Sequence, residues 1–138
     1  MGHVNWLEVL VAAVIIFVLG WLWYSPLLFM KPWMRLRGID PDQAMAAAGG
    51  KMPVGKLVIE FVRCFVLALC VTRFAGLVGV YSVLIAIHFG LALWIGFPLV
   101  LLTGSVIWDN VNWKVAAIHA GDWFVKLLVL AILATVWR

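Results

Sequence analysis

Three polar side chains interrupt one of the most apolar stretches of the sequence, AAIHAGDWFVKLLVLAIL at residues 116–133. They are His119, Asp122 and Lys126. At 100° per residue, a helix places Asp122 about 60° and Lys126 about 20° from His119, so all three lie on one stripe. Charged groups inside membrane spans usually face the bundle interior, pair with one another and mark pathways for ions or protons. This stripe is therefore the candidate functional face.

A second apolar stretch, residues 57–76, carries charges at a matching depth. Each lone charge at mid-membrane costs at least about 2.5–3.5 kcal/mol, so buried charges need partners. We expect Arg63 to pair with Asp122, and Glu60 to pair with His119. Together with Lys126, these residues would form an intramembrane polar cluster.

Lys126 lies toward the other end of its span, where Glu8 is the only obvious acidic partner. His88 could join the same group as a neutral hydrogen-bond donor. Trp94 and Trp123 fall at mid-span, away from the interfaces where tryptophan usually gathers. They either pack against neighbouring helices or, with Glu8 and His88, line an internal cavity.

Common sequence motifs of catalytic and nucleotide-binding sites are absent from the sequence. H-E-x-x-H, G-x-S-x-G, P-loop and G-x-G-x-x-G patterns do not occur, so hydrolase or nucleotide chemistry has no support and no cofactor is expected. A membrane enzyme would need a paired acid and base with solvent access, and only His119 with Glu60 offers such a pair. His119 and Asp122 at i,i+3 resemble half of a metal site in a helix bundle, but no second pair of this kind exists, so no metal is expected. Cys64 and Cys70 do not have a zinc-ligand spacing.

The composition predicts an integral membrane protein. Of 138 residues, 67% are hydrophobic and 12% are charged, whereas soluble domains are about half apolar and a quarter charged. At about 20 apolar residues per span, one all-α transmembrane domain of four helices accounts for residues 1–138. The expected helices are residues 5–28, 57–76, 81–103 and 112–136.

One long polar loop, residues 29–56, separates the first two expected spans. Within it, DPDQAMAAAGG predicts a short surface helix, with Asp40 as cap, Pro41 in the first turn and Gly49-Gly50 as stop. A flexible linker is the alternative. Of the Lys and Arg residues near span ends, six lie on the side of this loop and two on the other, which predicts a cytoplasmic loop and both termini outside. The net charge of +4 favours anionic lipid headgroups as partners, not nucleic acid.

Several motifs together resemble a known family. They are NW at Asn5-Trp6, WYSPLLF at residues 23–29, GFPL at residues 96–99 and the HAGDW segment at residues 119–123. With Lys31, Trp33 and Trp137 they are similar to the domain-of-unknown-function family 1761, uncharacterised small bacterial membrane proteins. The resemblance implies a four-helix membrane bundle and carries no activity with it.

Two functions fit these features. The first is a transport-type or proton-coupled permeation unit that uses the charged cluster, with His119 able to change protonation near neutral pH. Four helices rarely enclose a transport path alone, so this hypothesis predicts a homodimer or larger assembly. The second is a non-transporting accessory, scaffold or lipid-binding protein in which the buried charges only fix the helix register. The sequence identifies no small-molecule or ion substrate.

Overall fold

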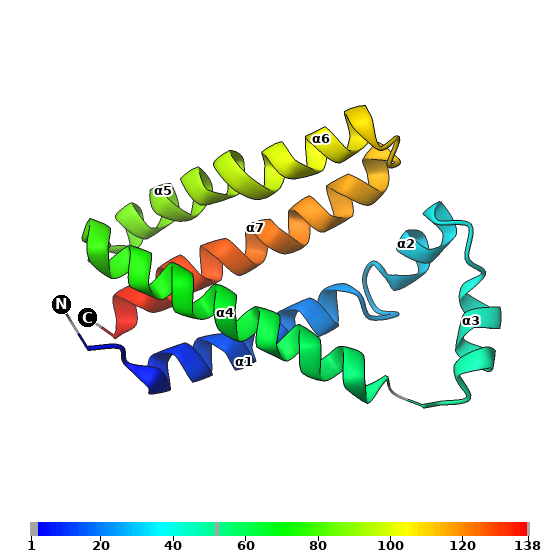
Figure 1. Cartoon of the computed structure of the whole chain (residues 1–138), viewed down its shortest axis with the longest axis horizontal. Helices are drawn as coiled ribbons and strands as arrows, with labels where there is room; N and C mark the ends of the chain where they lie inside the picture. Colours follow the sequence, from blue (N-terminus) through cyan, green and yellow to red (C-terminus); the bar gives the residue numbers. More distant parts are fainter. Residues whose placement is uncertain (1–2, 52, 138) are drawn as a thin grey trace.

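The computed structural model describes residues 3–51 and 53–137, and every regular element in these ranges is helical. Four long helical segments make up the body of the molecule, and two short helices project from one end (Figure 1). The body consists of α1 (Trp6–Trp23), α4 (Val54–Val78), the continuous series α5 (Val83–Trp94), η1 (Ile95–Leu99) and α6 (Val100–Trp108), and α7 (Trp113–Val136). The short helices are α2 (Met30–Leu36) and α3 (Pro41–Ala48).

Three of the long segments in the described part are long and apolar enough to cross a membrane: Trp6–Trp23, Val83–Trp108 and Trp113–Val136. The helix α4 has 25 residues, but it carries charged side chains along its length and is not among these three. The chain is therefore an all-α protein with three membrane-type helices, and a fourth crossing by α4 belongs to the proposal below.

The helix α1 begins where expected but ends five residues early. The side chain of Asn5 caps it by accepting a hydrogen bond from the Glu8 amide. It ends at Trp23, whereas the sequence predicted residue 28. The residue before a proline is disfavoured in helical conformation, so Ser25-Pro26 turns the chain, and the Ser25 hydroxyl donates to the Leu22 carbonyl in this turn.

The loop after α1 contains two short helices where one was predicted. The helix α3 forms as expected: Asp40 accepts from the Asp42 amide, Pro41 lies in the first turn, and Gly49 ends the helix with φ of 58°. The helix α2 was not predicted, and it has no side-chain cap at its N-terminus. Pro32 lies in its first turn, where a missing N–H costs nothing.

Pro98 interrupts the third long segment without ending it. The five residues of η1 form a π-helical turn around the proline, and the helix then continues as α6 to Trp108, five residues beyond the predicted end. Proline cannot donate to the helical hydrogen-bond ladder, and π-turns are a common way to accommodate such a break. Pro98 therefore lies within a π-turn that lets the helix continue past it.

The helix α7 is the central element, because α1, α4 and the α5–α6 series all pack against it. A small residue allows α5 to approach α7 closely. At Gly90 of α5, a Cβ atom would lie 3.2 Å from the Leu128 Cα atom of α7. The main apolar core joins α1, α4 and α7, and its buried members are Val9, Ala12, Ala13, Ile16, Cys64, Ala68, Val71, Leu127 and Leu130.

The long segments alternate in direction so that the connections gather at two ends. The helices α2 and α3 and the α6–α7 turn lie at one end, and both chain termini and the α4–α5 turn lie at the other (Figure 1). This arrangement positions the start of α7, with His119 in its second turn, beside α2, and it brings α4 across α1 and α7 near the middle of the molecule.

Candidate functional site

The centre of the candidate site is an ion pair within α7. The Lys126 Nζ atom lies 3.0 Å from the Asp122 Oδ2 atom, and the two residues are one helical turn apart. Both are buried, with relative exposures of 7% and 6%. Side chains at i and i+4 are neighbours on a helix surface, so this pair forms without help from another helix.

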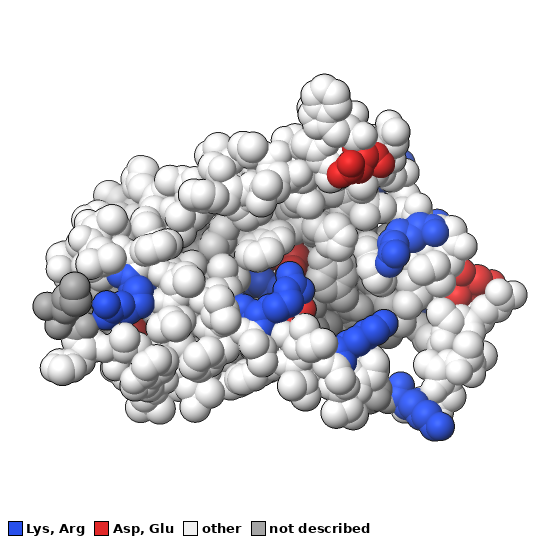
Figure 2. Space-filling view, viewed as in Figure 1, with Lys and Arg blue, Asp and Glu red and all other residues white. Residues whose placement is uncertain are grey.

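Two charged residues of α4 extend the pair to the surface. The Glu60 Oε1 atom lies 3.9 Å from the Lys126 Nζ atom, so this ammonium contacts carboxylates from two helices. Arg63 in turn donates to the other oxygen of Glu60. The side chain of Glu60 is 37% exposed and that of Arg63 is 62% exposed. Figure 2 shows blue and red atoms meeting near the middle of an otherwise mostly white face.

Gly20 of α1 closes the site on the side away from α4. A Cβ atom at this position would lie 3.0 Å from the Lys126 Nζ atom and 3.8 Å from the Asp122 Oδ1 atom. The ion pair therefore occupies the space that a side chain on α1 would need. The pair lies in contact with α1, and its neighbours Glu60 and Arg63 on α4 are the partly exposed members of the group.

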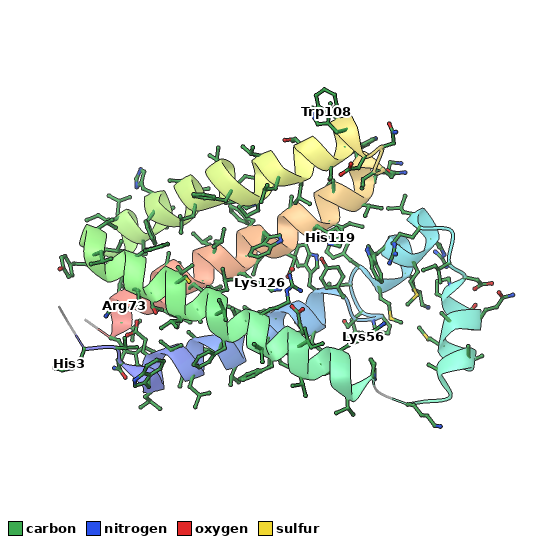
Figure 3. The ribbon with its side chains drawn as sticks, viewed as in Figure 1. His3, Lys56, Arg73, Trp108, His119 and Lys126 are labelled. Carbon is green, nitrogen blue, oxygen red and sulfur yellow. The ribbon has the colours of Figure 1, made fainter. Side chains whose placement is uncertain are left out.

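His119 lies nearer the α2 end of the molecule than Lys126 (Figure 3). Its Nδ1 atom shares a hydrogen bond of 2.5 Å with the Tyr24 hydroxyl, just after the end of α1. Burial, with smaller contributions from the Asp122 and Glu60 carboxylates, raises the pKa of Tyr24 above its ordinary range. The hydroxyl keeps its proton, and when it donates to Nδ1 the imidazole carries its own proton on Nε2.

Aromatic side chains enclose this hydrogen bond. The Trp33 ring of α2 lies edge-on to both the Tyr24 ring and the His119 ring, at centroid distances of 5.8 and 6.4 Å. The Arg37 guanidinium lies 4.9 Å from the centre of the Trp33 ring, in cation–π geometry. These contacts attach α2 to α7, so Trp33 is a packing residue between helices.

Two tryptophans bind the backbone of α7 at the HAGDW segment. The Trp23 indole N–H donates to the Ile118 carbonyl at 3.0 Å, and the Trp94 N–H donates to the Ala120 carbonyl at 2.8 Å. Gly121 makes room for the first of these rings, because a Cβ atom there would lie 2.6 Å from the Trp23 ring. Trp94 was predicted at mid-span, and it packs against α7 from the α5 side.

The predicted pairing of the charges is wrong. Asp122 pairs with Lys126 instead of Arg63, Arg63 pairs with Glu60 of its own helix, and His119 bonds to Tyr24 instead of Glu60. Partners one turn away on the same helix satisfy the charges first, because their side chains are already adjacent. Three residues nevertheless come together as a cluster across two helices: Glu60, Asp122 and Lys126.

Glu8 and His88 lie apart from this cluster. Glu8 is twelve residues from Gly20 on α1, about 18 Å along the helix, so it is not a partner of Lys126. It instead lines a cavity of about 270 Å³ at the end with the termini, together with Thr72, Arg73 and Trp137.

His88 is exposed on the outer face of α5, and its Nδ1 atom bonds to the Leu84 carbonyl one turn earlier, so it does not line an internal cavity. Trp123 borders the charged cluster, as its position beside the polar stripe suggested. The Lys126 Nζ atom lies 6.0 Å from the centre of its ring, and the ring packs against the main core.

The sequence reasoning missed Gly20 and Tyr24 as members of the site. Gly20 follows a run of large apolar residues in α1, and a glycine in a helix interior often marks close approach of another group. Tyr24 lies within the WYSPLLF motif, which was read as the end of a span. Among the described residues, no group of three His, Cys, Asp or Glu side chains converges as a metal site would require.

In its described part, the chain is an all-α protein with three membrane-type helices and a charged cluster between α4 and α7. Comparison with known families then places the chain. Residues 7–135 match the family described as "Protein of unknown function (DUF1761)", and the chain belongs to this family. No curated protein and no solved structure matches the chain.

Proposed function

We propose that this protein is a small four-span membrane protein that acts as a proton-coupled permeation unit through the cluster of Glu60, Asp122 and Lys126. One observation carries the proposal: a buried ammonium lies between a buried carboxylate at 3.0 Å and a partly exposed one at 3.9 Å. The helix α4 is the fourth span in this proposal. The basic loop with α2 and α3 faces the cytoplasm of a bacterial cell, where it meets anionic lipid headgroups.

The two distances suggest how the cluster works. When Asp122 and Glu60 are both ionised, the ammonium stays with the nearer carboxylate of Asp122. A proton on Asp122 weakens that attraction, and the ammonium moves toward Glu60, which is within reach of the α4 surface. The two positions of the Lys126 side chain give the cluster two states that proton binding selects.

The test is proton flux in proteoliposomes. Vesicles containing a trapped pH-sensitive dye receive a pH gradient, and dye fluorescence reports its decay. We expect wild-type protein to discharge the gradient faster than protein-free vesicles do, and Asp122→Asn to discharge it at the protein-free rate. The control is Asp109→Asn, which removes an exposed carboxylate beyond the end of α6 and should behave as wild type.

Equal decay for wild type and Asp122→Asn, with both proteins helical by circular dichroism, would refute the proposal. Decay at the protein-free rate for all three proteins would refute it as well.

A second candidate is an accessory, scaffold or lipid-binding protein in which the charges are structural. The close contact between Gly20 and Lys126 favours it, because the ion pair is enclosed on the α1 side. In this case the cluster fixes how α1 and α7 pack, and no flux depends on it. Decay at the protein-free rate, combined with a large loss of stability when the pair is broken, is the result that this candidate predicts.

A further inference from the structure

One face of α4 is exposed from Ile59 to Cys70 and again at Leu77, with the half-buried Arg73 between them, and we name it the α4 seam. Its members are spaced four, three, four and seven residues apart, which is the heptad spacing of helices that pair with another helix. They are Ile59, Arg63, Val66, Cys70 and Leu77. Ile59, Val66 and Leu77 are 63%, 52% and 76% exposed, and Cys70 is exposed as well.

Arg63 makes this seam different from an ordinary lipid-facing surface. Its side chain is 62% exposed among apolar neighbours, and the guanidinium has five N–H donors. Among the described residues, only its Nη1 atom takes part in an ion pair, with Glu60. Hydrocarbon offers no acceptor for the other donors, so a surface that covers this position must supply one.

The charge of the cluster indicates what covers it. Arg63 and Lys126 carry two positive charges, and Glu60 and Asp122 carry two negative charges, so the group is neutral. An anionic lipid headgroup would leave one negative charge in excess. A second copy of the chain instead presents the same neutral pair, with a carboxylate for each guanidinium and a guanidinium for each carboxylate.

We propose that the α4 seam pairs with the α4 seam of a second copy in a parallel twofold dimer, with Arg63 of each copy bonded to Glu60 of the other. Identical positions face each other at equal depth in such a contact. Glu60 and Arg63 differ by about 4.5 Å along the helix, which an arginine side chain spans. The dimer goes beyond the proposed function and does not depend on proton flux.

Cys70 provides the test, because a parallel twofold contact brings the two copies of this residue together. Purified protein in phosphatidylcholine vesicles is oxidised with copper phenanthroline and separated on a non-reducing gel. We expect a cross-linked dimer from wild type and from Cys64→Ser, because Cys64 is buried. Cys70→Ser should remove the dimer band.

Arg63→Ala tests the charged contact within the same experiment. Loss of charge-assisted hydrogen bonds should raise the dissociation constant of the dimer by about tenfold. The measurement is the cross-linked fraction, which should fall when the protein is diluted into additional lipid. The matched control is Lys56→Ala, which removes an equal charge seven residues earlier on the same face and should leave the cross-linked fraction unchanged. Equal losses for both variants would point to a general charge effect and overturn the proposal.

Three further outcomes would contradict the α4 dimer. The first is no dimer band from wild type. The second is a dimer band only from Cys70→Ser carrying Ala92→Cys, which would place the contact on the exposed face of α5. The third is loss of the band when phosphatidylglycerol is added, which would show that anionic lipid occupies the seam.

Discussion

Lys126 holds the charged cluster together, because its ammonium contacts carboxylates from two helices. Helix angles placed Asp122 and Lys126 on one stripe from the sequence alone, and the structure shows them adjacent there. Their partners could not be predicted in this way, since contacts depend on side-chain rotamers and on the residue that faces them. Gly20 contributes to the outcome, because a Cβ atom there would lie 3.0 Å from the Lys126 Nζ atom and the ammonium would have to shift to make room.

A double-mutant cycle measures how strongly Asp122 and Lys126 are coupled. Lys126→Met leaves Asp122 buried without its ammonium, and breaking a buried pair in this way costs about 3–5 kcal/mol. Asp122→Asn should cost less, because Glu60 still faces Lys126 at 3.9 Å. The double variant should be more stable than Lys126→Met. The free energy of unfolding in mixed micelles, followed by circular dichroism, gives these values.

Additive losses in the double variant would show that the two charges do not stabilise each other. Asp109→Asn is the control, and we expect it to unfold within about 0.5 kcal/mol of wild type because this residue is exposed outside the helices.

The helices were predictable where apolar length, proline and glycine determine them. The segments α4, α5–α6 and α7 lie within a few residues of the expected ranges, apart from the extension of α6 to Trp108. The errors occurred where tertiary contacts decide. The helix α2 has a short sequence with no capping signal, and it is attached through the contacts of Trp33 with Tyr24 and His119.

The close approach of α5 and α7 depends on Gly90. Gly90→Leu places a side chain against the Leu128 backbone, which cannot move aside without separating the helices. We expect a loss of about 1–3 kcal/mol in the free energy of unfolding, as for other overpacked contacts. Gly104→Leu on α6 is the matched control, because no atom lies within 4 Å of a Cβ at that position. Equal stability of the two variants would contradict this view of the α5–α7 contact.

At the scale of the whole molecule, the chain has two unlike ends. One carries α2, α3 and most of the basic residues, and the other carries both termini and the α4–α5 turn (Figure 1). The alternation of helix directions agrees with the arrangement that the sequence predicted. Which end faces the cytoplasm depends on the charge asymmetry alone, so it stays a prediction.

Cysteine labelling in intact cells tests this orientation. In a background without Cys64 and Cys70, Tyr81→Cys places a thiol in the α4–α5 turn and Ala46→Cys places one in α3. We expect a membrane-impermeant maleimide to label Tyr81→Cys from outside and to label Ala46→Cys only after the cells are permeabilised. The reverse pattern would invert the proposed orientation, and labelling of both from outside would exclude a membrane between the two ends.

The contact between the Lys126 ammonium and Gly20 restricts how α1 and α7 can move relative to each other. One turn before Gly20 lies Ile16, one turn after it lies Tyr24 just beyond the end of α1, and both carry large side chains. If α1 slid past α7 by one turn, one of these side chains would clash with the ammonium. The contact at Gly20 therefore opposes sliding of the two helices. As long as the ammonium stays beside Gly20, we expect α1 and α7 to move together, and a change of shape to come from α4 or from the α5–α6 series.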